Sequence, residues 1–147
     1  MRLLVAILLG CLVGLGGSTF LYGKGFSYFS NDPRACKNCH IMSDQFDSWL
    51  KSSHHAVAAC NDCHTPHGLV RKLMTKADNG FWHSKGFTLQ DFPEPIRIRR
   101  HNRQVLNRNC QECHHDLVNE VVAAHAHDET RFDCIRCHVA SGHGPER

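Results

Sequence analysis

The sequence predicts a mainly α protein: an N-terminal transmembrane helix followed by a compact domain of short helices and loops, with little or no sheet. Three observations predict this fold. An uncharged apolar run opens the chain, one cysteine–histidine motif occurs four times after it, and apolar residues between the motifs recur at helical spacing. We therefore expect an anchor over residues 1–25 and a single domain over residues 26–147.

The apolar run from Leu3 to Tyr22 has twenty residues and no charge, which is the length that crosses a bilayer as a helix. Arg2 is the only charged side chain before it, and this places the N-terminus in the cytoplasm and the domain outside. A cleaved signal peptide usually has a shorter apolar core. The apolar sequence that follows Cys11 argues against a lipoprotein cleavage site there. The sequence thus favours an uncleaved, single-pass anchor.

Eight of the nine cysteines belong to four copies of Cys-x-x-Cys-His, and Cys11 alone is left over. This motif is the signature of covalent c-type haem attachment. Zinc ribbons pair two Cys-x-x-Cys units, but they do not need a histidine directly after each one. The sequence therefore predicts four covalently bound haem c groups, attached through Cys36, Cys39, Cys60, Cys63, Cys110, Cys113, Cys134 and Cys137.

Four haems change how the core and the charge are interpreted. They leave too few residues for an ordinary side-chain core, so the haem faces should supply most of the buried apolar surface, and the chain should not fold without them. The formal net charge is +3 before propionates are counted, and two propionates on each haem offset it. The basic residues therefore predict propionate pairing or contact with membrane lipid, and no nucleic acid partner.

The motifs fall into two pairs. The first cysteines of motifs 1 and 2 are 24 residues apart, as are those of motifs 3 and 4, and 50 residues separate the pairs. This spacing predicts a repeated dihaem unit with a central insertion. A helix against the haems is expected inside each pair, from the spacing of Phe46, Trp49, Leu50 and Ser53 and of Leu117, Val118, Val121, Val122 and His125.

The insertion begins with Thr65-Pro66, an expected helix N-cap followed by proline at the first helical position. The apolar face of this helix suits a lipid surface, although a helix packed on haem with solvated charges would show the same pattern. That face consists of Leu69, Val70, Leu73, Met74 and Ala77. Gly80 could break the helix. Prolines 93 and 95 then predict an extended loop, and the arginines after them suit propionates, a partner or solvent.

Nine histidines lie outside the motifs, and a bis-histidine haem needs one of them as its second ligand. His55 lies too close to motif 2 to serve that haem, so it is a candidate for another. His143, His125 and His127 are further candidates. Motif 1 offers a different choice, since Met42 follows His40 by two residues and a thioether is also a common axial ligand. Two residues are too few for both to bind opposite faces of one haem, so the residues alone leave both open.

The stretches CKNCHIM, HAVAACNDCHTPHG, KADNGFWH and CIRCHVASGHG resemble those of the NapC/NirT/NrfH family of membrane-anchored tetrahaem quinol dehydrogenases. The compact length and the stretch FTLQDFPEPI are most similar to the branch that serves cytochrome c nitrite reductase. The resemblance implies a single-pass protein of the bacterial cytoplasmic membrane with its haem domain in the periplasm. It implies oxidation of menaquinol and electron transfer to the catalytic subunit NrfA, which reduces nitrite to ammonia, with no nitrite reduction by this chain alone. The alternative is a quinol dehydrogenase that feeds a nitrate, sulfoxide or hydroxylamine enzyme.

The same resemblance implies the axial ligands. Met42, and not His40, would bind haem 1, and a methionine ligand suits an entry haem because it favours reduced iron. A second ligand for haem 4 would come from His127 or from a lysine of the catalytic partner. The remaining assignments are His64 with His143 for haem 2, His114 with His55 for haem 3, and His138 for haem 4.

The resemblance also implies a quinol site beside haem 1. Lys76 matches the lysine of the family's site, and the family's acidic position falls on His83 in this chain. Asp78 is a nearby carboxylate that could compensate. A neutral His83 is a suitable proton acceptor because the usual histidine pKa lies near the working pH.

Overall fold

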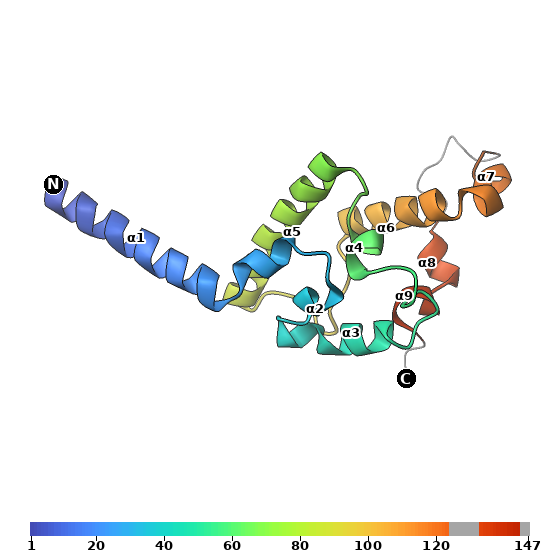
Figure 1. Ribbon diagram of the computed structural model, residues 1–147, viewed down its shortest axis with the longest axis horizontal. Coiled ribbons are helices and arrows are strands. Elements are labelled where there is room, and N and C mark those ends of the chain that lie inside the picture. The colour runs from blue at the N-terminus through green and yellow to red at the C-terminus, as the bar shows by residue number, and fades with distance from the viewer. Residues whose placement is uncertain (124–132, 145–147) are drawn as a thin grey trace.

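The computed structural model describes residues 1–123 and 133–144, and within these ranges the chain is helical and has no strand (Figure 1). The predicted mainly α fold is thus confirmed. In chain order the elements are α1 (Arg2–Tyr22), η1 (Gly25–Phe29), α2 (Pro33–Cys36), η2 (His40–Met42), α3 (Ser43–Trp49), α4 (Cys60–His64), α5 (Leu69–Leu89), α6 (Arg100–Cys113), α7 (His115–Ala123), α8 (Cys134–Cys137) and α9 (Ala140–His143).

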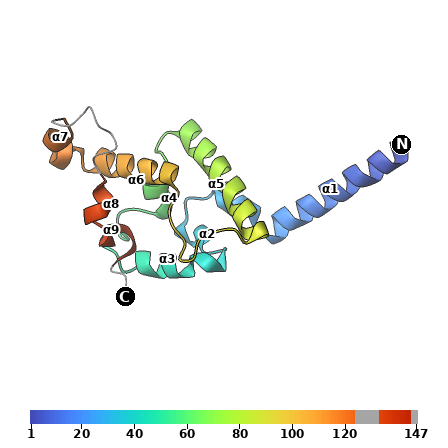
Figure 2. The ribbon, with the colours of Figure 1, turned by 180° about the vertical axis from the view of Figure 1, so that it is seen from behind.

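Helix α1 runs away from the rest of the chain, as Figures 1 and 2 show from opposite sides. Its mean hydropathy is 2.2, none of its residues is buried, and among the described residues it is the one helix long and apolar enough to cross a membrane. Between its two ends, the backbone donors and acceptors of α1 are paired within the helix, which is what a lipid environment requires. The chain is a single-pass membrane protein on this feature and on the family assignment given below.

Helix α6 contacts α4, α7 and α8, and α3 packs against α9 below them in Figure 1. Asn109 is buried on α6, and its amide donates to the carbonyls of Asp62, Cys63 and Thr65 at 2.9, 3.0 and 2.8 Å. Those carbonyls lie at the C-terminal end of α4, where helix carbonyls have no partner within the helix. Asn109 therefore holds the helix of motif 2 against the helix that carries motif 3.

The interior is polar. Asn102 on α6 donates to Asn79 on α5 at 2.7 Å, and both residues are buried. Val105 is the one buried apolar residue among those described. Burial of side chains against each other therefore stabilises this fold very little, which agrees with haem faces as the main source of buried apolar surface.

Two features of the central insertion differ from the sequence expectation. The long helix begins at Leu69 with Gly68 as its N-cap, because the Thr65 hydroxyl donates back to the Asn61 carbonyl at 2.7 Å at the C-terminal end of α4. Gly80 does not break the helix, which continues to Leu89. The arginine-rich stretch expected as a loop becomes helical from residue 100 onward and leads into motif 3.

Candidate functional site

Each Cys-x-x-Cys-His motif coincides with a short helix or a helix end. Motif 2 is α4 itself, motif 4 opens with α8, and motif 3 is the last turn of α6. Motif 1 starts at the last residue of α2 and continues into η2. A helical turn brings the two cysteines of a motif to one side of the chain, where both can reach the same macrocycle.

The thiols of motifs 1 and 2 meet directly. A hydrogen bond between them lowers the pKa of Cys36 to about 7 and raises the pKa of Cys60. Further along, burial raises the pKa of Cys63, with smaller contributions from the charges of Asp62 and Cys113. Burial followed by the charge of Cys134 raises the pKa of Cys110 to about 11. Cysteine neighbours therefore run from motif 1 to motif 2, then to motif 3 and then to motif 4.

His64 and His143 form the first histidine pair, with ring centroids 6.0 Å apart. Burial and the charge of His143 lower the pKa of His64 to about 4, so its ring is neutral and has a lone pair to offer. His143 donates through Nδ1 to the Gln45 carbonyl at 3.1 Å, which leaves its Nε2 for a metal.

Gly144 makes that pair possible. Its φ is +68°, and a Cβ at this position would lie 3.2 Å from the Ser48 carbonyl of α3. A left-handed residue in such close approach favours glycine strongly. Gly144, which directly follows His143, thus lets α9 lie against α3 and places His143 beside His64.

The second histidine pair was not the one expected. His54, and not His55, faces His114, with ring centroids 6.0 Å apart. His54 donates through Nδ1 to the Ser141 carbonyl at 2.9 Å, so its Nε2 is available. His55 instead lies against Trp49 at 6.2 Å. Adjacent residues point to different sides of the chain, and the residues alone gave no way to choose between these two.

Both pairs have the spacing that one iron requires. Two imidazoles on opposite sides of a metal, each bonded at about 2 Å, have ring centres about 6 Å apart. The interplanar angles of 44° and 80° are both compatible with this, because each ring can turn about its bond to the metal. In contrast, residues 1–123 and 133–144 contain no cluster of three His, Cys, Asp or Glu side chains suited to a metal ion such as zinc. The residues present therefore fit haem.

Within residues 1–123 and 133–144, motif 1 has no such pair. His40 is exposed, whereas Met42 is half-buried at the end of η2. The partial burial of Met42 is what a thioether ligand needs, but the choice between Met42 and His40 as the ligand of haem 1 stays a prediction.

Lys76 is buried beside motif 1. Its ammonium donates to the carbonyls of Tyr28 and Ser30 at 2.9 and 3.0 Å, and its charge helps to lower the pKa of Cys36. Burial followed by the charge of Lys72 lowers the pKa of Lys76 itself. Two of its three N–H bonds therefore hold η1 and the chain after it against α5, and the third is left for a ligand.

His83 lies two turns further along α5 and is exposed. Desolvation of its ring and the charge of Arg99 lower its pKa, while Asp78 opposes the shift. Asp78 accepts from Arg99 at 2.8 Å and from the Trp82 indole at 3.1 Å, and these bonds lower the pKa of Asp78. Asp78 is thus a poor proton acceptor, whereas His83 is neutral at working pH and can accept a proton.

Tyr28 is a residue of this region that the sequence interpretation missed. Its ring lies over Gly80 of α5, with ring and hydroxyl atoms 3.6 to 3.9 Å from where a Cβ of Gly80 would be, and 5.9 Å from the Lys76 ammonium. Burial, followed by the charges of Cys36, Cys39 and Asp78, raises the pKa of Tyr28 to about 12. Gly80 lies between Lys76 and His83 in the sequence of α5, so the phenol packs on the stretch of helix that separates them. Only the glycine inside the stretch KADNGFWH hinted that another side chain approaches there.

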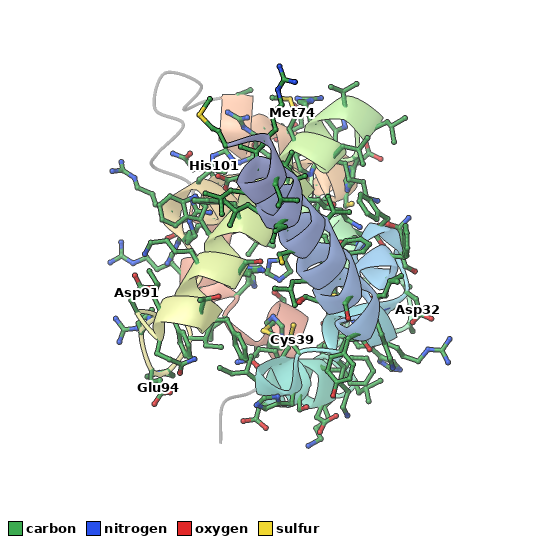
Figure 3. The ribbon with its side chains drawn as sticks, turned by 90° about the vertical axis from the view of Figure 1, so that its left-hand side faces the viewer. Asp32, Cys39, Met74, Asp91, Glu94 and His101 are labelled. Carbon is green, nitrogen blue, oxygen red and sulfur yellow. The ribbon has the colours of Figure 1, made fainter. Side chains whose placement is uncertain are left out.

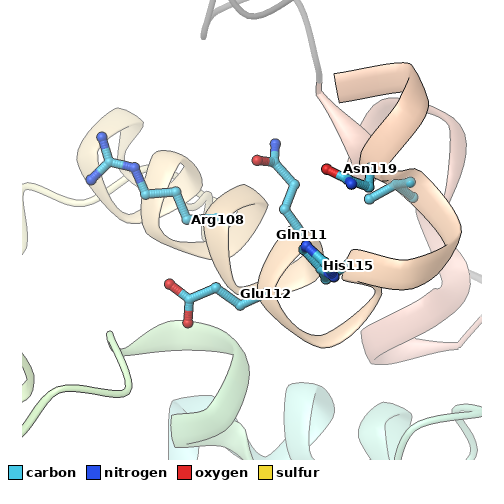
Figure 4. A pocket seen from close by; sticks show the side chains of 6 residues that line it. Arg108, Gln111, Glu112, His115 and Asn119 are labelled. Atoms are coloured by element: carbon cyan, nitrogen blue, oxygen red, sulfur yellow. The ribbon is translucent and has the colours of Figure 1, made fainter. Parts of the chain in front are cut away.

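The far end of the domain is more open. A pocket of about 260 Å³ lies where α6 meets α7, and Figure 4 shows its polar lining of Arg108, Gln111, Glu112, His115 and Asn119, completed by Val118. A hollow of about 350 Å³ lies between η1 and α2. Neither contains a residue of the expected quinol site. His138 follows α8, and His127, the candidate partner for it, lies outside the described residues.

Known proteins resemble the whole chain. The NapC/NirT cytochrome c family, N-terminal region, matches residues 1–146. The cytochrome c-type protein NrfH of Wolinella succinogenes is 35% identical, over 97% of this chain and 83% of that protein. The cytochrome c nitrite reductase subunit NrfH of Nitratidesulfovibrio vulgaris is 36% identical, over 84% of this chain and 78% of that protein.

Among solved structures, the cytochrome c nitrite reductase NrfHA complex bound to the inhibitor HQNO contains a chain that matches this one with a TM-score of 0.67 and 29% identity, covering 100% of this chain and 93% of that chain. The agreement includes the anchor as well as all four motifs, because it extends over the full length. The chain therefore belongs to the NapC/NirT cytochrome c family.

Proposed function

We propose that this chain is the membrane-bound tetrahaem subunit that oxidises menaquinol and passes the electrons to NrfA, the catalytic subunit of cytochrome c nitrite reductase. The full-length similarity to NrfH, in sequence and within the NrfHA complex, is the observation that carries the proposal. The four haems would each carry one electron at a time, and the chain supplies their ligands and their order.

The neighbour relations of the cysteines support a direction of transfer. Motif 1 follows the anchor in sequence, and the cysteine contacts then lead through motif 2 and motif 3 to motif 4. Electrons would enter at motif 1, near the membrane, and leave at motif 4. The partner would dock at the end of the domain opposite α1, where α7 and α8 lie in Figure 1.

Two haems would be held by the histidine pairs. His64 and His143 would bind haem 2, and His114 and His54 would bind haem 3, so His54 takes the role that the sequence gave to His55. Met42 would bind haem 1. Haem 4 would have His138 and either His127 or a lysine of the partner.

The quinol site would lie on the side of α5 that faces motif 1. Quinol oxidation releases two protons, so the site must contain acceptors as well as hydrogen-bonding groups. The third N–H of Lys76 would orient a quinol oxygen, and His83 would take one proton. Asp78, held by Arg99, would position His83 and keep a negative charge beside it.

Reconstitution tests the function. The full-length chain in vesicles with menaquinol should oxidise quinol only when an acceptor is supplied, and nitrite should be consumed only when NrfA is also present. Nitrite reduction by the chain alone would contradict the proposal. Equal rates with a nitrate or sulfoxide reductase in place of NrfA would point to a different partner.

Topology is tested on cells that express the protein. With an uncleaved anchor and a periplasmic domain, protease added to intact spheroplasts should digest the haem domain. The intact mass of membrane-extracted protein should equal the full chain plus four haems of about 616 Da each. A mass that lacks the first twenty-odd residues would show that the anchor is removed.

A further inference from the structure

Helix α5 has its polar residues inside and apolar residues outside. Its buried residues are Thr75, Lys76 and Asn79. On the opposite side lies an exposed stripe, here called the outer stripe, which consists of Val70, Met74, Ala77 and Phe81. These four residues recur at intervals of three and four, and Val70, Met74 and Phe81 are 70%, 67% and 64% exposed. A soluble helix would present the opposite arrangement.

The orientation of α5 is fixed by bonds on its inner side. Lys76 holds two backbone carbonyls near motif 1, and Asn79 accepts from Asn102 of α6. Rotation of the helix to bury the outer stripe would break all three bonds and leave buried polar groups without partners, which is unfavourable. The exposure of the outer stripe is therefore a built feature of the fold.

The outer stripe faces away from motif 1. Lys76, whose charge acts on Cys36 of motif 1, is one of the buried residues on the inner side of α5. The outer stripe lies on the opposite side of the helix. Figure 3 looks at the molecule from the side of α1, with α1 in front, and labels Met74 near the N-terminal part of α5.

The anchor joins the domain at the C-terminal end of α5. Figures 1 and 2 agree that α1 leaves from this end and runs crosswise to α5, on the side away from the other helices. The joint is closely packed. Phe20 of α1 meets Phe26 of η1 edge to face at 5.0 Å, and a Cβ on Gly25 would lie 2.3 Å from the Phe20 ring. Tyr28 of η1 then packs against Gly80 of α5. The direction of α1 is thus coupled to that of α5.

We propose that α5 lies along the membrane surface, with the outer stripe immersed at the boundary between lipid headgroups and acyl chains. When α1 spans the bilayer, a helix crosswise to it at its outer end lies parallel to the surface. Arg71 beside the outer stripe suits anionic headgroups, and Trp82 is of a type enriched at the interface. This placement goes beyond the choice of reductase and does not depend on it.

The placement has a consequence for substrate entry. The inner side of the same helix carries Lys76, and His83 lies two turns along it. A quinol headgroup at the interface would then be separated from them only by the thickness of one helix, about 10 Å. A quinol with a long isoprenoid tail could therefore be oxidised while its tail stays in the bilayer.

The test is photolabelling of the full-length holoprotein in vesicles of phosphatidylethanolamine and phosphatidylglycerol that contain a phospholipid with a diazirine at the top of its acyl chain. Label should appear on peptides with the outer stripe and on the end of α1. It should be absent from Leu117 and Val139, which are 80% and 72% exposed but belong to the far end of the domain. Because no quinol is involved, the result is independent of the proposed function.

Three outcomes would overturn the placement: label on α1 with none on the outer stripe, equal label on Leu117 and the outer stripe, or protection of the outer stripe only after NrfA is added. The last would make α5 a docking surface for the partner.

A second measurement uses a paired variant. Met74→Glu with Phe81→Glu should remove the label and raise the apparent KM for a long-chain quinol severalfold, while a water-soluble short-chain quinol is oxidised at the normal rate. Leu117→Glu is the matched control and should change neither. Equal loss with both quinols would overturn the placement, because it would show damage to the site itself.

Discussion

The same Cys-x-x-Cys-His motif has different surroundings beside the anchor, at motif 1, and further from it, at motifs 2 and 3. Around motifs 2 and 3, histidines lie in pairs with ring centroids 6.0 Å apart. In each pair, the histidine from outside the motif, His143 or His54, is oriented by a hydrogen bond to a backbone carbonyl. Around motif 1 there is no pair among the described residues. A half-buried methionine, a buried lysine and a tyrosine packed against α5 lie there instead. This contrast fits the proposal that haems with two histidine ligands transfer electrons and that haem 1 receives them.

The largest expected effect tests the entry region. Met42→Ala should abolish quinol oxidation and disturb the spectrum of haem 1, because a thioether would no longer bind the iron and stabilise its reduced form. The comparison variant is His40→Ala, which should leave the haem 1 coordination spectrum largely intact. Resonance Raman and EPR spectra of the two holoproteins decide it. If His40→Ala removes the axial ligand of haem 1 and Met42→Ala leaves the spectrum unchanged, His40 and not Met42 binds this haem.

The next effect tests the transfer region with adjacent residues. His54→Ala should convert haem 3 from low spin to high spin and slow electron delivery to the acceptor by about tenfold or more, since an outer ligand to the metal is lost. His55→Ala is the matched control and should leave the spin state unchanged, because His55 lies against Trp49. If only His55→Ala gives a high-spin haem, His55 is the second ligand of haem 3, as the sequence resemblance implied.

The same comparison extends to haem 2 through the backbone. Gly144→Ala places a Cβ 3.2 Å from the Ser48 carbonyl at a φ of +68°, so α9 should shift away from α3 and His143 away from its partner. We expect partial high-spin character at haem 2 and lower thermal stability, by about 1–3 kcal/mol. Gly142→Ala controls for the loss of glycine, since its Cβ meets no atom within 4 Å. Equal spectra for the two variants would show that Gly144 does not position His143.

Some features of this fold could be predicted from the sequence and others could not. The anchor and the four motifs could be predicted, because an uncharged run and a covalent attachment motif each carry their own physical signal. Helix α6 was not predicted, because two of its three buried residues, Asn102 and Asn109, are polar and only Val105 is apolar, so few apolar residues mark its buried face. Thr65 looked like the start of a helix but its hydroxyl bonds back into the preceding one. His54 and His55 are adjacent, and which of them faces His114 depends on the local backbone conformation, which the sequence does not show.

A smaller effect concerns the residue that the sequence missed. Tyr28→Phe keeps the ring over Gly80 and removes only the hydroxyl, so the fold and the four haem spectra should not change. If the phenol donates to a quinol oxygen, its loss should raise the KM for quinol severalfold, in line with about 1 kcal/mol for one hydrogen bond. Electron uptake from dithionite bypasses the quinol site and should be unaffected. An unchanged KM would mean that Tyr28 is a packing residue beside motif 1.

The smallest effect separates the two acid–base residues on α5. His83 must be neutral to accept a proton, and its pKa is lowered by desolvation and by the charge of Arg99. Quinol oxidation should therefore persist below the usual histidine pKa and fall only as the pH drops through the lowered value.

Arg99→Gln removes that positive charge and also frees the carboxylate of Asp78 from its ion pair. Both changes favour the protonated imidazole, so the acid limb of the rate should move to higher pH. At alkaline pH the two proteins should oxidise quinol at the same rate, because His83 is neutral in both. Arg97→Gln serves as the control, since Arg97 is not among the charges that act on His83. A shift of the limb to lower pH, or the same shift in both variants, would show that a group other than His83 takes the proton.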